Sequence, residues 1–553
     1  MSRKIVKNFF KYSLIVIAIF IFIIAFNFQK IIVKFTSFII ENSINKQVKM
    51  QYDEKKVTKS KNDININQFK AELDQMSDLK FKNIGNLISN SNIKDIQSLY
   101  DSKKLTCEEL VIYYLKRIEK YDINKLNSII ELNPDVIKIA REKDKETRSG
   151  KLYGIPITLK ANIGTSDKIH TTAGSYALKD SILDEDSFIV KKLRSEGAII
   201  LGKTNLSEFA NYMTTKSSNG YSALGGQTQN PYGKFDVGGS SSGSASSVAS
   251  GFSVASIGTE TAGSIIYPSS QNSVVGIKPS IGLISRDRIV PIAESQDTAG
   301  VISKNVDDDA LILSSIYGYD TNDKDTIASK NLDENYSNYL TEKSIKGIKV
   351  AILKPFAARS NESDILERIE KEFKGMGNQT QIVSFSDEIN NIKMSEALEA
   401  GFKFDIAKYL KTAKVNRVNS LNDIVYINKE DLENRAPYGQ DLLEKSLSNK
   451  MTYEEYKNLV ESNKNIASKE IDSILKNADV IVSLSDQAAT AYAPAGYPAL
   501  TVPAGYKSSG KPIGITFVGS KFEEGKFEEG KLLKIANVYE TNTKYRKDPN
   551  LKY

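Results

Sequence analysis

Ser264 is the residue of this sequence that is best placed to act as a nucleophile. It closes the turn GTETAGS, which follows an apolar run at Phe252–Ile257 with the character of a buried strand. The segment that begins at Gly238 consists mostly of glycine, serine and alanine, so backbone or substrate can approach it closely. A serine on a glycine-rich turn beside free backbone N–H groups combines a nucleophile with donors for an oxyanion. We therefore expect acyl-transfer chemistry at Ser264.

A serine nucleophile needs a base, and the sequence contains only one histidine, His170. A lysine can serve instead when burial keeps it neutral. Lys160 follows the apolar run Ile155–Leu159 in YGIPITLKANIG, at the end of an expected strand. We interpret His170, in the loop SDKIHTTAGS, as a surface or hydrogen-bonded residue. A role as base or ligand is the alternative, but no set of residues at metal-binding spacing accompanies it.

The segments around these residues alternate between short strands and helices. Strands are expected at Lys151–Leu159 and Ala198–Leu201, with helices at Asp186–Glu196 and Asn205–Tyr212. A capping box, Thr-x-x-Glu, begins a further helix at Glu108–Tyr121. Such alternation predicts an α/β fold.

Several motifs together resemble the amidase signature family, and peptide amidases within it most closely. They include the glycine- and serine-rich stretch, the turn GTETAGS, the strand GIPITLK, and the segments LNSIIELNP, ILGKTNLSEFANY and AGYPALTVPAGY. The likeness spans roughly residues 80 to 540, with the motifs in order, which is far more specific than one motif alone. The resemblance implies one large α/β catalytic domain at 81–545, with a large mixed β-sheet covered by helices on both faces.

The resemblance also implies a role for each residue of a Ser-Ser-Lys triad. Ser264 corresponds to the acylated serine, Ser240 to a bridging serine that follows a cis peptide bond, and Lys160 to the base. The oxyanion hole would be formed by the backbone N–H groups of Thr261, Ala262, Gly263 and Ser264. To act near neutral pH, Lys160 must lose about 3 units of pKa, or about 4 kcal/mol, which burial without an acidic partner can supply.

Three positions depart from the family pattern. Ala161 stands where an aspartate usually follows the catalytic lysine, and Ala262 replaces aspartate or glycine but keeps its N–H group. Members that act on acidic substrates, and amidotransferase subunits, carry an arginine shortly after the nucleophile. Here that segment reads SIIYP, from Ser264 to Pro268. Without a guanidinium to bind a carboxylate, a neutral amide is the expected substrate.

An apolar segment near the N-terminus predicts a membrane anchor. Leu14–Phe26 is uninterrupted, and extension to Tyr12–Phe28 gives a helix of roughly 26 Å, enough for a thin bilayer. More cations precede it than follow it closely, which favours a cytoplasmic N-terminus and an extracytoplasmic domain. We assign residues 1–30 to a signal anchor and 31–80 to a spacer. A cleaved signal peptide, and so a secreted enzyme, is the alternative.

Composition excludes several other classes. The net charge is +7, but cations and anions are interspersed without a basic stripe, so nucleic acid binding is not expected. The single cysteine, Cys107, is interpreted as inert, although a helix start can activate a thiol. No metal and no cofactor are expected.

The sequence therefore predicts a membrane-bound serine amidohydrolase that acts on a small-molecule or peptide amide, for example a peptide C-terminal amide. Two alternatives remain open at this point. One is the ammonia-generating subunit of a tRNA amidotransferase, which the missing arginine and the anchor oppose. The other is an inactive binding protein on the same fold, for which Ala161 is the only support.

Overall fold

The computed structural model describes residues 64–354, 363–413, 415, 417–520 and 528–551. The expected anchor, residues 1–30, and most of the expected spacer, residues 31–80, lie outside this part of the chain. Within the described residues, no helix is both long and apolar enough to span a membrane. Packing begins before the expected domain start at residue 81, because Phe69, Leu73 and Met76 are already buried in the main core.

The fold is built on one mixed sheet of 11 strands, in the order β1-β3-β2-β6-β8-β7-β12-β13-β11-β9-β10. The bounds are β1 Ile129–Leu132, β2 Pro156–Lys160, β3 Ile199–Thr204, β6 Ala255–Glu260, β7 Val275–Lys278, β8 Thr298–Ser303, β9 Lys349–Leu353, β10 Gln379–Val383, β11 Val480–Leu484, β12 Ala499–Tyr506 and β13 Pro512–Val518. The strands β4 Tyr221–Ser222 and β5 Gly226–Gln227 form a separate pair. Strand β2 runs parallel to both of its neighbours, β3 and β6, so their carboxyl ends meet at one edge.

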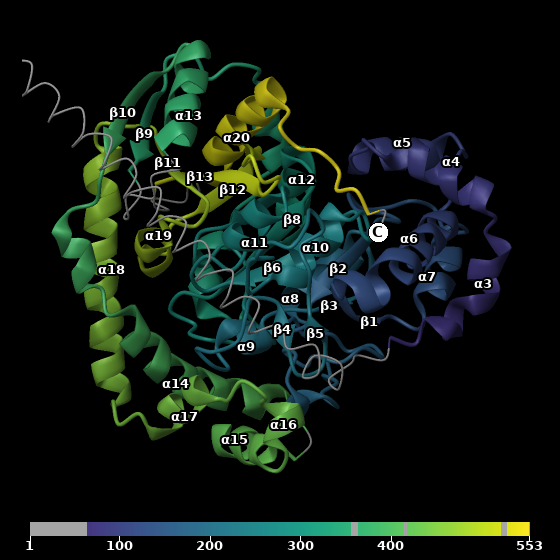
Figure 1. Cartoon of the computed structure of the whole chain (residues 1–553), viewed down its shortest axis with the longest axis horizontal. Helices are drawn as coiled ribbons and strands as arrows, with labels where there is room; N and C mark the ends of the chain where they lie inside the picture. Colours follow the sequence, from purple (N-terminus) through teal and green to yellow (C-terminus); the bar gives the residue numbers. More distant parts are fainter. Residues whose placement is uncertain (1–63, 355–362, 414, 416, 521–527, 552–553) are drawn as a thin grey trace, which may run out of the picture.

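Helices surround this sheet (Figure 1). Their bounds are α3 Lys70–Gln75, α4 Asp78–Ile88, α5 Ile93–Asp101, α6 Cys107–Tyr121, α7 Val136–Lys143, α8 Phe188–Ser195, α9 Glu208–Asn211, α10 Ser242–Ala249, α11 Ile266–Gln271, α12 Val306–Ile316, α13 Ser363–Gly375, α14 Met394–Ala413, α15 Leu421–Lys429, α16 Leu432–Arg435, α17 Asp441–Ser448, α18 Tyr453–Leu475, α19 Ala489–Ala495 and α20 Glu529–Thr543. The capping box predicted before α6 is present.

Both faces of the sheet are covered by helices, as expected. Successive residues of a strand point to opposite faces. In β8, Ile302 belongs to a cluster with Ala245 and Val248 of α10, whereas its neighbour Val301 belongs to the main core with Ile312 of α12. The large mixed α/β architecture predicted from the sequence is therefore confirmed.

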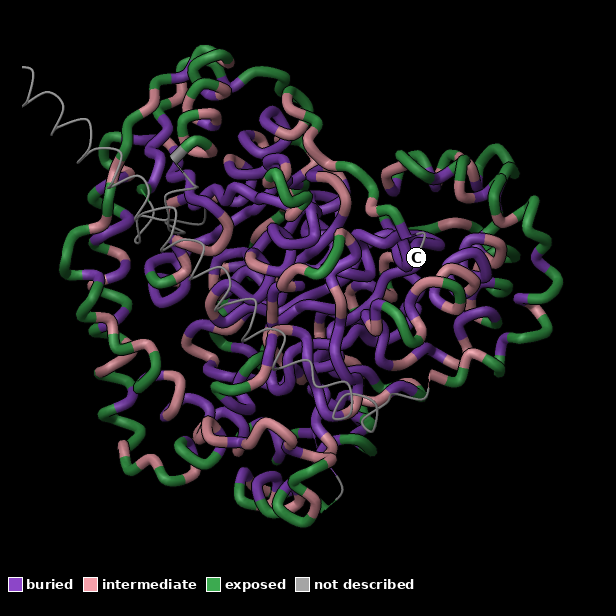
Figure 2. Tube along the Cα trace, viewed as in Figure 1, coloured by how far each residue is buried: buried purple, intermediate pink, exposed green. Residues whose placement is uncertain are grey.

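Helices α14 to α17 form a separate group beside the sheet, and α18 follows them along the edge of the molecule (Figure 1). They have their own core, in which Phe402 and Ile406 pack with Phe209, Tyr212 and Ile292 from the sheet part of the chain. The centre of the sheet is almost entirely buried, while exposure concentrates on the outer helices (Figure 2).

The glycine- and serine-rich segment is part of the core and not a linker. Every residue of α10 is buried. A Cβ atom on Gly243 would lie 2.3 Å from the Ser128 carbonyl oxygen and 2.4 Å from that of Asn205. Only glycine permits this approach, which brings α10 against the loops after β3 and before β1.

The helix predicted at Asn205–Tyr212 is reduced to the irregular turn α9. Phe209 and Ala210 adopt positive φ values of 49° and 56°. The Phe209 N–H group donates to the Ala173 carbonyl at 3.0 Å, and the Glu208 carboxylate accepts the Ala223 N–H at 2.9 Å. Long-range partners thus replace the local hydrogen bonds that a helix needs, and the prediction was wrong for this reason.

Candidate active site

Lys160 ends strand β2 and is fully buried. Ile257 of the neighbouring parallel strand β6 pairs with Leu159. This pairing brings the Lys160 side chain next to Thr259, close to the end of β6. The Nζ atom of Lys160 contacts three oxygen atoms: Ser240 Oγ at 2.7 Å, Thr259 Oγ1 at 2.8 Å and the Thr259 carbonyl at 3.1 Å. No described residue forms an ion pair with it.

Burial lowers the pKa of Lys160 to about 7, because the ammonium ion loses its hydration there. The negative charges of Asp297 and Glu260 act in the opposite direction and limit this fall. At neutral pH a large fraction of the amine is therefore unprotonated and able to accept a proton. The pKa of Lys160 is thus lowered in the direction that a lysine base near neutral pH requires.

Ser240 precedes α10 and is fully buried. The Gly239–Ser240 peptide bond is cis, as the resemblance implied. The Ser240 carbonyl accepts the N–H group of Ser207 at 3.1 Å, and the N–H group of Ser241 donates to the Ser264 carbonyl at 3.1 Å. The segment that carries Ser240 is thereby tied to the turn that carries Ser264.

Ser264 lies between β6 and α11, and it is the one member of the predicted triad that reaches solvent. Its residue is 8% exposed, against 0% for Ser240 and Lys160. Among the described residues, the side-chain hydrogen bond between Lys160 and Ser240 is present, but none joins the hydroxyl groups of Ser240 and Ser264. Catalytic hydrogen bonds often tighten only when substrate binds.

Glu260, the last residue of β6, holds the nucleophile turn in shape. One of its carboxylate oxygens accepts the N–H group of Gly263 at 2.8 Å. The other accepts those of Ile265 at 2.7 Å and Ile266 at 3.0 Å. A buried carboxylate with three backbone donors fixes the backbone on both sides of Ser264.

This arrangement changes the predicted oxyanion hole. The Gly263 N–H group points to Glu260, so it is not available to a substrate oxyanion and its assignment was wrong. Within the described part of the chain, no acceptor engages the N–H groups of Thr261, Ala262 and Ser264. These three remain candidates for the oxyanion hole.

The alternative nucleophile and base lie elsewhere. His170 Nδ1 is 2.7 Å from Glu131 Oε1, and the hydrogen bond with this carboxylate raises the pKa of the imidazole. The Cys107 thiol is buried at the start of α6, and burial raises its pKa to about 12. Neither residue contacts Ser264 or Lys160, and neither has the properties of an activated catalytic group.

Ala161 and the segment from Ser264 to Pro268 are two of the departures from the family pattern. Ala161 is fully buried and packs with Ile130 and Leu206, so apolar contacts fill the place of the usual aspartate. The Tyr267 hydroxyl, on α11, donates to Asp236 Oδ2 at 2.8 Å. No arginine stands between Ser264 and Pro268.

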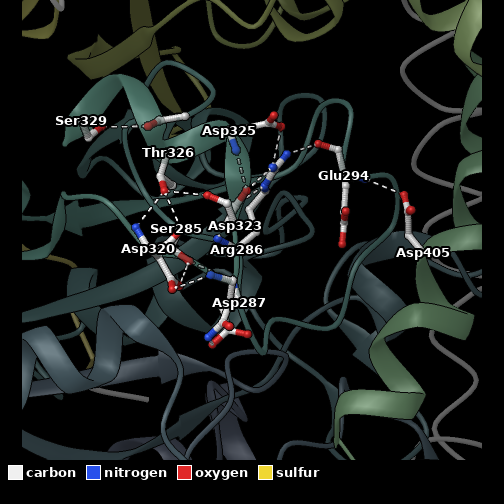
Figure 3. A network of polar contacts seen from close by, with 12 residues as sticks. Ser285, Arg286, Asp287, Glu294, Asp320, Asp323, Asp325, Thr326, Ser329 and Asp405 are labelled. Carbon is white, nitrogen blue, oxygen red and sulfur yellow. Dashed lines mark hydrogen bonds and ion pairs between the residues drawn. The ribbon is translucent and has the colours of Figure 1, made fainter.

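Arg286 anchors the loop between β7 and β8, which leads to Asp297. Its side chain lies between two carboxylates (Figure 3), with Nε donating to Asp323 at 2.8 Å and Nη2 donating to Asp325 at 2.6 Å. The Arg286 guanidinium also donates to the Glu294 carbonyl, and the Glu294 N–H group donates to Asp405 of α14 at 2.7 Å. The loop thus connects the sheet to the group of helices α14–α17.

Asp297 transmits this support to the nucleophile turn. Its carboxylate accepts the N–H groups of Ile292 at 2.8 Å and Ala293 at 3.0 Å. The same carboxylate accepts the hydroxyl group of Thr261. Thr261, the first residue after β6, is therefore held from outside the turn that carries Ser264.

A cavity of about 600 Å³ adjoins the nucleophile turn. Ala262 and Tyr267 line it on the side of the turn, and Asp486 lines it from the loop after β11. Its size is that of a small-molecule or short peptide site. In the described part of the chain, no group of three or more histidine, cysteine or acidic side chains is arranged to hold a metal.

Sequence reasoning missed Glu260, Thr259 and Asp486. An acidic residue inside the apolar segment that leads to GTETAGS was a usable signal for Glu260, because a buried carboxylate requires partners. No local signal pointed to Asp486, since only the fold brings it to the turn.

Comparison with known proteins agrees with this geometry. The chain matches the family described as Amidase over residues 109–491. A protein from Arabidopsis thaliana described as a probable amidase is 37% identical over 481 residues, which cover 84% of this chain and 92% of the relative. A glutamyl-tRNA(Gln) amidotransferase subunit from Prochlorococcus marinus is 32% identical, with 81% and 97% covered. The crystal structure of a peptide amidase from Stenotrophomonas maltophilia has a TM-score of 0.79 at 32% identity, with 84% and 99% covered.

Proposed function

Because the chain belongs to the amidase family and is therefore a hydrolase of amide C–N bonds, we propose that it works through an ester on Ser264. Lys160 is the base, and Ser240 passes the proton between Ser264 and Lys160. The observation that carries this proposal is the 2.7 Å contact of a buried lysine amine with the Ser240 hydroxyl. A lysine with a pKa of about 7 can both take and return a proton at neutral pH.

Acylation begins when the Ser264 oxygen attacks the carboxamide carbon. The Ser264 proton moves to Ser240 while the Ser240 proton moves to the lone pair of Lys160. The two N–H groups of the neutral amine are directed to the oxygen atoms of Thr259, which leaves the lone pair for Ser240. The negative charge that forms on the carbonyl oxygen is stabilised by backbone N–H groups of the turn.

Collapse of the tetrahedral intermediate breaks the C–N bond and leaves the acyl group on Ser264. The proton held by Lys160 returns through Ser240 to the leaving nitrogen, which departs as ammonia or an amine. In deacylation a water molecule attacks the ester, its proton follows the same route, and the carboxylic acid is released. No step requires a metal or a cofactor.

The substrate that we propose is a neutral carboxamide, such as the C-terminal amide of a peptide. The structural neighbour from Stenotrophomonas maltophilia is named a peptide amidase, which supports this class. The segment from Ser264 to Pro268 contains Tyr267 and no arginine. A substrate with a carboxylate beside the reacting amide would therefore lack a guanidinium partner there. The similarity to an amidotransferase subunit favours the alternative of a glutamine amidase, whose ammonia would be passed to a tRNA-bound substrate.

A panel of amides with ammonia release as the readout tests this proposal. Peptide amides should be hydrolysed without any added acceptor for the ammonia, which should appear free in solution. Glutamine hydrolysis that appears only with added partner proteins and charged tRNA would support the amidotransferase function instead. Complete inactivity, with Ser264 unreactive toward a fluorophosphonate probe, would support an inactive binding protein.

For the cellular location, we propose that residues 1–30 remain as an uncleaved anchor and that the catalytic domain lies outside the cytoplasm. The uninterrupted apolar segment and the cations before it support this topology. External protease should then remove the domain from intact cells, and the solubilised protein should keep its original N-terminus. A new N-terminus near Phe28 would indicate a secreted enzyme, and protection from protease would indicate a cytoplasmic one.

A further inference from the structure

Asp486 places a carboxylate against the nucleophile turn. It follows β11 in the loop that leads to α19 and lines the cavity of about 600 Å³ together with Ala262. A Cβ atom built on Gly263 would lie 3.2 Å from Asp486 Oδ2, so this oxygen lies against the residue before the nucleophile. A group that binds this carboxylate from the cavity therefore lies beside the turn that carries Ser264.

No cation of the protein neutralises Asp486 within the described chain. The ion pairs formed by the described residues do not include it. Two further carboxylates lie near it, and each is occupied by other donors: Glu260 accepts three backbone N–H groups, and Asp236 accepts the hydroxyl of Tyr267. Both carboxylates act on Asp486 as like charges. Of these three carboxylates only Asp486 lines the cavity, so the negative charge that a ligand meets beside the turn is that of Asp486.

Two lysines also line the cavity, and the ion pairs among the described residues do not join either of them to Asp486. Lys507 and Lys511 line it from the turn between β12 and β13, where the Lys507 N–H group donates to the Lys511 carbonyl. Strand pairing sets Leu484 opposite Ile515, and the Ser485 N–H group donates to the Gly514 carbonyl. Continuing this antiparallel register places Asp486 near the start of β13, and the two lysines follow further toward the tip of the turn.

We propose that this enzyme selects amides that carry a positive charge within a few bonds of the scissile carboxamide, and that Asp486 recognises this charge. The inference rests on the proposed function, because it takes the cavity beside Ser264 as the substrate site. An ammonium or guanidinium group would replace the missing counter-ion of Asp486 with a charge-assisted hydrogen bond. The substrate class is then an amino-acid or peptide amide with a free α-amino group or a basic side chain.

Ionisation of Asp486 is compatible with this role. Burial raises the pKa of its carboxyl group to about 6, with a further contribution from the nearby charges of Glu260 and Asp236. At the neutral to alkaline pH at which Lys160 can act as a base, Asp486 is therefore mostly ionised.

Two pairs of amides separate charge from size. Leucinamide is compared with N-acetyl-leucinamide, and N-acetyl-lysinamide is compared with N-acetyl-norleucinamide. For each amide, kcat/KM is measured from ammonia release, and binding is measured as protection of Ser264 from a fluorophosphonate probe. We expect the cationic member of at least one pair to be preferred about tenfold or more by the wild-type enzyme.

Variants assign the preference to Asp486. Asp486→Asn should reduce the ratio of cationic to neutral kcat/KM to about one, and Asp486→Glu should retain much of it. Asp387→Asn, which removes an exposed acid outside the cavity, is the matched control and should keep the wild-type ratio. Because Asp486 is partly buried, Asp486→Ser is made as a second neutral variant, and melting temperatures confirm that the variants fold.

Two results would overturn the inference: no preference in either pair for the wild-type enzyme, or a preference that survives in a folded neutral variant. If neither neutral variant folds, the wild-type pairs alone decide. These results differ from a failure of the proposed function. In that case Ser264 would not react with the probe and no amide would release ammonia, whereas here neutral amides would be hydrolysed without a charge preference.

Discussion

The Nζ atom of Lys160 lies 2.7 Å from the Oγ atom of Ser240, although 80 residues separate them in the chain. The parallel pairing of β2 with β6 and the close packing of the glycine- and serine-rich segment create this contact. Both residues are fully buried, so the contact is shielded from water.

Replacement of Lys160 should remove the base. Lys160→Ala should lower turnover by on the order of 10²- to 10⁴-fold, which is the usual contribution of general acid–base catalysis. Lys160→Arg should be similarly impaired, because a guanidinium stays charged. His170→Ala is the control and should keep most of the activity, since His170 pairs with Glu131 away from the site. An inactive His170 variant beside an active Lys160 variant would refute the assignment.

Activity should fall as the pH drops below about 7. Burial lowers the pKa of Lys160 to about 7, and the base must be neutral to accept a proton. The protonated fraction therefore rises as pH falls, and kcat/KM should decrease about tenfold for each pH unit well below this pKa. The measurement is kcat/KM for a neutral amide between about pH 5 and about pH 9. A profile that stays flat across the acidic part of this range would point to a different base.

Glu260 is expected to act as a positioning residue. Glu260→Gln keeps the shape of the side chain but only one of its two acceptor oxygens, so either the N–H group of Gly263 or those of Ile265 and Ile266 lose their acceptor. We expect kcat to fall by about 10²-fold, as when an oxyanion donor is lost. The lost negative charge should also move the acidic limb of the pH profile to lower pH, because Glu260 raises the pKa of Lys160.

Glu131→Gln is the matched control for Glu260, since it removes a carboxylate that pairs with His170 and lies away from the turn. Its kcat and its acidic limb should resemble those of the wild-type enzyme. Wild-type kcat and an unshifted pH profile in Glu260→Gln would show that the carboxylate does not position the turn.

Arg286 should contribute strongly to stability. Its guanidinium is 10% exposed and pairs with Asp323, whose side chain is 6% exposed. Arg286→Met leaves that carboxylate without its counter-ion, so the free energy of unfolding should fall by about 3–5 kcal/mol. Arg141→Met, which removes a 45% exposed guanidinium from an ion pair with Glu108, should cost at most about 1 kcal/mol. Equal losses in urea unfolding of the two variants would contradict this account.

Local sequence patterns were sufficient for the parts of the site that depend on one strand and one turn. The prediction of a buried strand before Lys160 is confirmed by β2, although β2 begins at Pro156 and not at Lys151, because residues 151–154 form a turn. Short strands, helices and the capping box before α6 likewise depend on neighbouring residues. The glycine-rich turn also indicated Ser264 as the nucleophile, whereas the bridging role of Ser240 came from the family resemblance, because no local pattern assigns it.

Features that depend on distant partners could not be predicted in this way. The segment of α9 has helix-forming residues, but Ala173 and Ala223 compete for its backbone and side chains. The resemblance assigned the Gly263 N–H group to the oxyanion hole, while the fold directs this group to Glu260. Asp486 reaches the turn only because β11 and β13 pair.

The most direct test of the central claim is to identify the residue that becomes acylated. The full-length protein is treated with a fluorophosphonate probe, or quenched during turnover of a slow ester substrate, and its peptides are sequenced by mass spectrometry. We predict a single modification on Ser264, absent in a folded Ser264→Ala variant, which should also release no ammonia from amides. Modification of any other residue, or amide hydrolysis by the Ser264→Ala variant at the wild-type rate, would contradict the account.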